Sequence, residues 1–156
     1  MEAPVVPDEA WIKVTNGATN MTPACRPRVV IADDHPGALH AVMGLLGVEN
    51  FQVVAAVPDG DLALDAVERF HPDLVILDVC MPHMDGIHAA RELNSKGFDG
   101  SIIFLTVQED EDYLSAAFAA GARAYVLKPR MMTDLLPAIG KALAGKTFVS
   151  APTSHA

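Results

Sequence analysis

Residues 74–86 read Leu-Val-Ile-Leu-Asp-Val-Cys-Met-Pro-His-Met-Asp-Gly. The unbroken apolar run from Leu74 to Leu77 is typical of a strand that is buried on both faces of a parallel sheet. Asp78 follows this run directly, and Asp85-Gly86 has the composition of a turn before the next amphipathic segment. The stretch therefore predicts a central strand with a carboxylate at its carboxyl end.

The same alternation of short apolar runs and longer amphipathic segments extends in both directions along the chain. The predicted strands are Val29 to Ala32, Gln52 to Ala56, Leu74 to Leu77, Ile102 to Leu105 and Ala124 to Val126. The predicted helices are Pro36 to Gly47, Gly60 to Phe70, Gly86 to Ser95, Asp110 to Ala120 and Met132 to Ala144. This alternation predicts an α/β fold, here a flavodoxin-like (βα)5 doubly wound parallel sheet with strand order 2-1-3-4-5 in a single domain.

Residues with capping preferences stand at the ends of several predicted helices. Asp59 and Asp110 are expected to act as helix N-caps. Gly47 and Gly121 stand where the end of a helix favours a left-handed residue. These positions agree with the predicted alternation.

Composition and charge restrict the classes of function. The chain has 156 residues, 51% of them hydrophobic, and a formal net charge of −9. Such a chain can bury one core, and its negative charge argues against direct nucleic-acid binding. Cys25 and Cys80 have neither the spacing of a zinc site nor the number for a disulfide framework. Because the sequence contains no membrane-spanning apolar run and no signal-peptide pattern, we expect a cytoplasmic protein.

Polar side chains follow the predicted strands at the edge where the ligands of open parallel sheets bind. Asp33 and Asp34 end the first strand, Asp78 ends the third, and Thr106 and Lys128 end the fourth and fifth. The first and third strands are neighbours in the predicted order, so three carboxylates should converge. Carboxylates this close together require a cation, and their hard oxygen atoms favour Mg²⁺.

A metal in this position suggests phosphoryl transfer to Asp78. The metal would offset the repulsion between an anionic donor and the attacking carboxylate, and Asp78 would become an acyl phosphate. The Lys128 ammonium can pair with one phosphoryl oxygen, and the Thr106 hydroxyl can donate a hydrogen bond to another.

These residues, taken in order, resemble the receiver domain of two-component response regulators. The resemblance rests on Asp33-Asp34, on the run Leu77 to Gly86, on Leu105-Thr106 and on Lys128-Pro129. It implies that Asp78 is the phosphoacceptor and that the main-chain carbonyl of Cys80 joins Asp33, Asp34 and Asp78 in binding Mg²⁺. It also implies that Tyr125 acts with Thr106 as a switch.

Two further stretches are similar to the subgroup of receivers that precede LuxR-type helix-turn-helix domains. They are Asp33-Asp34-His35-Pro36 and Gly145 to Ser150, although no such helices follow in this sequence. We expect a flexible N-terminal extension over residues 1–27, a receiver domain over 28–147, and a tail or truncated linker over 148–156. The implied partners are a histidine kinase or phosphotransfer protein and, on phosphorylation, a second copy of the chain.

Other functions compatible with the pattern are a haloacid-dehalogenase-type phosphatase, a flavodoxin-type flavin carrier and a scaffold that is never phosphorylated. The phosphatase would need a second acid where Cys80 stands, and Asp33-Asp34 would repel a flavin phosphate. The intact acidic set argues against the scaffold. His35, His83 and His88 match no compact metal-ligand spacing and are expected to be exposed.

Overall fold

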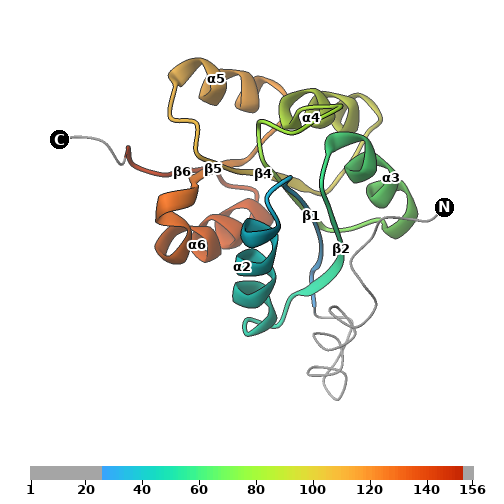
Figure 1. Cartoon of the computed structure of the whole chain (residues 1–156), viewed down its shortest axis with the longest axis horizontal. Helices are drawn as coiled ribbons and strands as arrows, with labels where there is room; N and C mark the ends of the chain where they lie inside the picture. Colours follow the sequence, from blue (N-terminus) through green and yellow to red (C-terminus); the bar gives the residue numbers. More distant parts are fainter. Residues whose placement is uncertain (1–25, 153–156) are drawn as a thin grey trace.

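The computed structural model describes residues 26–152 and places its strands in one parallel sheet (Figure 1). The six-stranded sheet has the order β2-β1-β3-β4-β5-β6. The strands are β1 (Arg28–Ala32), β2 (Gln52–Val57), β3 (Leu74–Leu77), β4 (Ser101–Thr106), β5 (Ala124–Leu127) and β6 (Phe148–Val149). The predicted order 2-1-3-4-5 is confirmed, and a short sixth strand, which the sequence pattern did not predict, pairs with β5.

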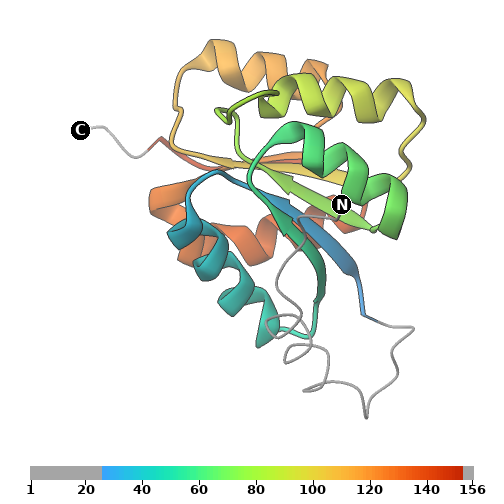
Figure 2. The ribbon, with the colours of Figure 1, turned by 45° about the vertical axis from the view of Figure 1, so that its right-hand side comes forward.

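Within residues 26–152, five α-helices cover the two faces of the sheet. They are α2 (Pro36–Gly47), α3 (Gly60–Phe70), α4 (Gly86–Ser95), α5 (Glu111–Ala119) and α6 (Met131–Leu143), and a 3₁₀ helix, η2 (Lys128–Arg130), precedes α6. Figure 2 shows α3, α4 and α5 on one side of the sheet and α2 and α6 on the other. This arrangement is the doubly wound architecture expected from the alternating pattern.

The core has two halves because successive strand residues point to opposite faces. In β3, Val75 and Leu77 pack under α3 and α4, whereas Leu74 and Ile76 pack toward α2 and α6. All four are at most 1% exposed. Full burial of such a side chain contributes roughly 1.5–3 kcal/mol. Burial on both faces therefore explains why the strands are continuously apolar.

Three of the four predicted helix ends are confirmed. The Asp59 side chain accepts a hydrogen bond from the amide of Leu62, and Asp110 accepts one from Asp112, so both are N-caps. Gly121 has a φ of +108°. The prediction for Gly47 is wrong, because Gly47 is still helical and the left-handed residue is Asn50, with a φ of +69°. Asparagine tolerates this conformation better than most residues, so the turn did not need glycine.

Both ends of the chain extend beyond the described residues. Residues 1–25 and 153–156 lie outside the described residues, so most of the expected N-terminal extension is not covered. The expected tail begins with β6, where Phe148 pairs with Ala124 and Val149 with Tyr125.

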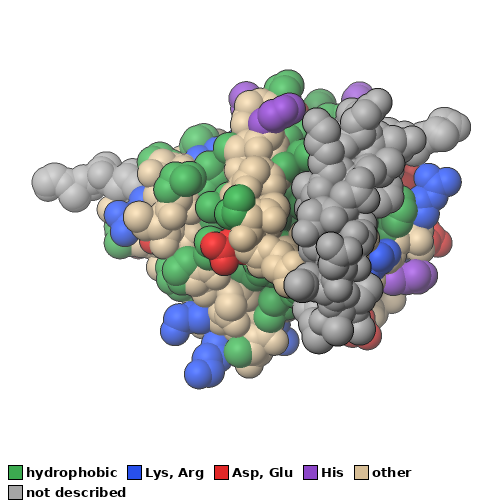
Figure 3. Space-filling view, turned by 90° about the horizontal axis from the view of Figure 1, so that it is seen from below, with side chains coloured by type: hydrophobic (Ala, Val, Ile, Leu, Met, Phe, Trp, Pro, Cys, Tyr) green, Lys and Arg blue, Asp and Glu red, His purple; other side chains and the backbone are tan. Residues whose placement is uncertain are grey.

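Between residues 26 and 152, no helix has the length and apolar character needed to cross a bilayer. Viewed from below, the visible Lys and Arg side chains are scattered and do not gather in one basic patch (Figure 3).

Candidate functional site

The site begins with two buried carboxylates at the carboxyl ends of neighbouring strands. β1 and β3 pair with Ala32 opposite Leu77, so the residues that follow, Asp33 and Asp78, emerge side by side. The amide of Asp78 donates to the carbonyl of Ala32 at 3.0 Å, which fixes this register up to the last residue. Asp33 is 3% exposed and Asp78 is 4% exposed. The structure thus brings together the two acids that the sequence placed at this edge.

Lys128 forms ion pairs with both carboxylates. It follows β5, and its Nζ lies 2.7 Å from Oδ2 of Asp33 and 3.0 Å from Oδ2 of Asp78. Burial lowers the pKa of Lys128, but its hydrogen bonds to Asp33 and Asp78 outweigh that effect and raise the pKa above its ordinary value. The lysine is therefore fully charged at neutral pH. One cation among three carboxylates leaves an excess of negative charge that suits a divalent metal.

The donor set fits Mg²⁺. One ligand atom from each of Asp33, Asp34, His35 and Asp78 can be chosen so that all lie within 4.8 Å of one another. Asp33 and Asp78 form the buried wall of this group, and Asp34 is exposed toward solvent. Buried carboxylates on one side and a solvent-exposed carboxylate on the other suit a cation that retains part of its hydration shell. These residues can hold the magnesium ion that the sequence predicted.

His35 lies in this cluster, which its spacing in the sequence did not indicate. Its side chain is 69% exposed, as expected, yet Nδ1 lies 3.3 Å from Oδ1 of Asp33 and 3.2 Å from Oδ1 of Asp34. The amide of His35 also donates to Oδ1 of Asp33 at 2.9 Å. His35 therefore helps to orient the Asp33 carboxylate.

The loop after β3 holds Asp78 through main-chain contacts. The amide of Val79 donates to Oδ1 of Asp78 at 2.7 Å, and the amide of Gly86 donates to the carbonyl of Val79 at 2.8 Å. A Cβ atom on Gly86 would lie 1.9 Å from the carbonyl oxygen of Asp78, so only glycine fits there. Cys80, the predicted carbonyl ligand, lies in this loop with an exposed side chain.

Thr106 and Tyr125, the predicted switch residues, are linked through Gln108. Thr106 ends β4 and is fully buried, and its Oγ1 accepts from the amide of Gln108 at 3.3 Å. The Tyr125 hydroxyl donates to the carbonyl of Gln108 at 2.8 Å. Burial, followed by the negative charge of Asp78, raises the pKa of Tyr125. Sequence reasoning missed Gln108 because both contacts to the switch residues use main-chain atoms, which any residue supplies.

This geometry agrees with a comparison to known families, in which residues 29–140 match the response regulator receiver domain. The chain belongs to this family. The family assignment confirms the resemblance that was drawn from the strand-end residues, and receivers of this kind are the phosphoacceptor domains of two-component systems. It also favours a receiver over the phosphatase and the flavin carrier considered above.

Named relatives of this receiver domain are transcriptional regulators. The regulator PdtaR of Mycobacterium tuberculosis is 39% identical over 126 residues, which cover 81% of this chain and 61% of that protein. The regulator DegU of Brevibacillus brevis is 31% identical over 129 residues, which cover 82% of this chain and 55% of that protein. The receiver domain thus spans little more than half the length of these relatives, and neither name denotes a dedicated enzyme.

Solved structures of similar receivers support the same assignment. A LuxR-family response regulator from Aurantimonas sp. SI85-9A1 matches with a TM-score of 0.76 and 29% identity, covering 81% of this chain and 91% of that one. The isolated receiver of RcsB from Salmonella enterica serovar Typhimurium, solved with the phosphomimetic BeF3−, has a TM-score of 0.73 and 29% identity. That match covers 80% of this chain and 94% of the other. The likeness to the LuxR-type subgroup is therefore confirmed.

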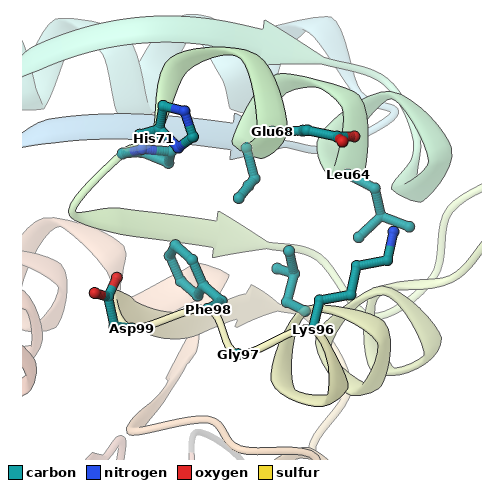
Figure 4. Close-up of a pocket in the computed structure, with 10 residues that line it drawn as sticks. Leu64, Glu68, His71, Lys96, Gly97, Phe98 and Asp99 are labelled. Atoms are coloured by element: carbon teal, nitrogen blue, oxygen red, sulfur yellow. The ribbon is translucent and has the colours of Figure 1, made fainter.

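A separate pocket opens at the opposite edge of the sheet, between the C-terminal halves of α3 and α4 (Figure 4). Its volume is about 340 Å³, and Phe98, Leu64 and other apolar side chains line it. Charged groups of both signs, Glu68 and Lys96, stand at its rim. His71 precedes β3 and Asp99 precedes β4, so the pocket lies at the amino ends of these strands and takes no part in the acidic site.

Proposed function

We propose that Asp78 accepts a phosphoryl group from a histidine kinase or a phosphotransfer protein in a Mg²⁺-dependent reaction. The observation that carries this proposal is the pairing of Lys128 with both Asp33 and Asp78 at the carboxyl edge of the sheet. Asp33, Asp34, Asp78 and the main-chain carbonyl of Cys80 would hold the metal. When bound, Mg²⁺ supplies positive charge that offsets the repulsion between phosphoryl oxygens and carboxylates.

The transfer step follows from the positions of the protein groups. An Asp78 carboxylate oxygen forms a bond to phosphorus while the bond from phosphorus to the imidazole nitrogen of the donor breaks, and that nitrogen keeps the electron pair. The Lys128 ammonium, released from its pairing with Asp78, then faces a phosphoryl oxygen. The Thr106 hydroxyl donates to another. In a separate, later step, slow attack by water on phosphorus breaks the bond to Asp78, restores the carboxylate and releases inorganic phosphate.

We further propose that phosphorylation changes the protein surface through Gln108. If the Thr106 hydroxyl turns to donate to the phosphoryl group, its contact with the Gln108 amide is lost. The same loop residue accepts the hydrogen bond from Tyr125, which is already buried at 3% exposure. Phosphorylation would therefore bias an equilibrium between two arrangements of the loop between β4 and α5, rather than move Tyr125 in from solvent.

The output of this switch is protein association in the cytoplasm, and formation of a homodimer is one form it can take. The relatives are longer transcriptional regulators, so we propose that DNA binding, where it occurs, belongs to a region beyond this domain. The net charge of −9 supports this division, since the phosphate backbone of DNA would be repelled by the domain itself.

The test is intact-mass measurement after incubation with Mg²⁺ and a small acyl-phosphate donor. The native chain should gain one phosphoryl group, whereas Asp78→Asn and a native sample with chelator should gain none. Asp85→Asn is the matched control, because Asp85 caps α4 in the same loop and should leave phosphorylation intact. If the native chain gains nothing with Mg²⁺, the unphosphorylated scaffold becomes the better explanation.

A further inference from the structure

The loop between β2 and α3 contacts both halves of the acidic site. On one side, the amide of Asp33 donates to the carbonyl of Val57, the last residue of β2, at 3.0 Å. On the other, the amide of Gly60 donates to the carbonyl of Met84 in the loop after β3, also at 3.0 Å. This short segment therefore connects the loop that carries Asp33 with the loop that carries Cys80.

Asp59, at the centre of this segment, makes a second contact with the loop after β3. Asp59 is 5% exposed, and its Oδ1 accepts from the amide of Leu62 as the N-cap of α3. Its Oδ2 lies 2.8 Å from Nδ1 of His83. Capping uses only one carboxylate oxygen. The other is therefore available to hold His83, whose side chain is 71% exposed.

The backbone of His83 has a conformation that normally favours glycine. Its φ is +67°, in the left-handed region, where a side chain is unfavourable unless other contacts compensate. The hydrogen bond to Asp59 is such a contact. At Gly60, a Cβ atom would lie 2.5 Å from the Met84 carbonyl oxygen, so the two loops approach each other too closely for any larger residue. Both observations show that the position of this loop is held by specific contacts.

We propose that Asp59 and His83 form a positioning pair that sets the affinity of the acidic site for Mg²⁺. By holding the loop after β3 against the segment after β2, the pair would fix the Cys80 carbonyl relative to Asp33 and Asp78. Without it, part of the binding free energy would be lost in ordering the loop when the metal binds. This inference rests on the proposed function, because it assumes that Mg²⁺ binds at these residues.

The experiment is a calorimetric Mg²⁺ titration of the unphosphorylated full chain and a double-mutant cycle of Asp59→Asn and His83→Gly. Asparagine keeps a side-chain oxygen for capping α3, and glycine relieves the left-handed backbone while removing the imidazole. Each variant should bind Mg²⁺ about threefold to tenfold more weakly, as expected for loss of one ordinary hydrogen bond, because the largely exposed His83 leaves the contact partly open to solvent. The double variant should be no weaker than either single one, because both remove the same contact.

Two further variants separate positioning from general destabilisation. His83→Asn should recover part of the affinity, because asparagine tolerates the left-handed region and its amide can donate to Asp59. His88→Gln, in α4, changes an exposed histidine outside this loop and should bind as the native chain does. In phosphorylation assays, the His83→Gly chain should need more Mg²⁺ for half-maximal rate but reach the native rate at saturation.

The outcomes distinguish this inference from the function on which it rests. If the native chain binds no Mg²⁺, the proposed function itself fails. If the native chain binds Mg²⁺ and His83→Gly binds it equally well, only the positioning pair is overturned. Should Asp59→Asn be unfolded at the assay temperature, the comparison of His83→Gly with His83→Asn still decides the matter, because both leave the cap of α3 intact.

Discussion

The ammonium nitrogen of Lys128 lies 3.0 Å from Oδ2 of Asp78, across fifty residues of sequence. The proposed phosphoacceptor is thus paired with a cation before any phosphoryl group arrives. Lys128 and a bound Mg²⁺ would both be attracted to the same carboxylates. Without metal, the Lys128 ammonium therefore stabilises the two buried carboxylates. When Mg²⁺ is present, the ammonium competes with the ion for the same carboxylate oxygens.

Replacing Lys128 by methionine should have opposite effects on metal binding and on phosphorylation. Mg²⁺ should bind more tightly, because the competing cation is gone, while phosphorylation should slow, because a phosphoryl oxygen loses its partner. Without Mg²⁺ the variant should lose roughly 3 kcal/mol of unfolding free energy, since the buried carboxylates remain without a counter-charge. Calorimetry, phosphorylation rates and urea unfolding measure the three effects.

The control for the Lys128 variant is Lys141→Met, on the exposed side of α6. Tighter Mg²⁺ binding by this control variant would contradict the explanation that Lys128 competes with the metal.

The strands and the polar residues that follow them could be predicted from the sequence because each rests on local pattern, and the order 2-1-3-4-5 followed from the flavodoxin-like architecture that the alternation indicates. Strands buried on both faces are apolar without interruption, as Leu74 to Leu77 shows, and the polar residue after each one is conspicuous. β6 could not be found in this way. It has two residues, Phe148 and Val149, and is stabilised by pairing with β5 rather than by a pattern of its own.

The contacts between loops could not be predicted from the sequence. Asp59 was expected only as a helix cap, and one of its carboxylate oxygens does cap α3. His83 was expected only as an exposed loop residue, and most of its side chain is exposed, although Nδ1 contacts Asp59. Their hydrogen bond spans 24 residues and depends on how two loops approach at the sheet edge. No periodicity or motif encodes that approach, so these details required the structure.

Substituting alanine for glycine should have opposite effects at Gly86 and at Gly140. At Gly86 the added Cβ would lie 1.9 Å from the Asp78 carbonyl oxygen, so the main chain beside the phosphoacceptor must move. We expect a loss of roughly 1–3 kcal/mol, the usual cost of overpacking, together with slower phosphorylation. At Gly140, inside α6, nothing lies within 4 Å of the added Cβ. There alanine should stabilise the chain by about 0.5–1 kcal/mol. Thermal unfolding would measure both, and equal effects would contradict the close contact at Gly86.

Tyr125 should remain protonated well above the pH at which a free tyrosine ionises. Burial and the charge of Asp78 raise its pKa from 10.0, so its contribution to stability is present below pH 10 and is lost as the pH rises above that value. The chain has two tyrosines, and Tyr113→Phe leaves Tyr125 as the sole phenol. In that variant, ultraviolet absorbance should show little phenolate at pH 10 while the chain is folded. Half-ionisation at that pH in the folded chain would show that Tyr125 is more accessible to solvent than the structure indicates.

Asp134 should make the free energy of unfolding depend on pH in the acidic range. This carboxylate, in the first turn of α6, accepts hydrogen bonds from Ser150 at 2.6 Å, Arg130 at 2.9 Å and Thr133 at 3.1 Å. Burial raises the pKa of Asp134, but these hydrogen bonds outweigh it and lower the pKa below 3.8.

Because the folded-state pKa of Asp134 is depressed, its contribution to stability is present above pH 3.8 and disappears as the pH falls through the folded-state value. Asp134→Asn should therefore reduce the unfolding free energy at pH 7 by roughly 1–2 kcal/mol, with a smaller difference below pH 4. Urea unfolding from pH 3 to pH 7 measures this difference, and Asp65→Asn, at an exposed position of α3, is the control. A difference that stays constant across the range would mean that the Asp134 charge does not hold Ser150 and the β6 segment against β5.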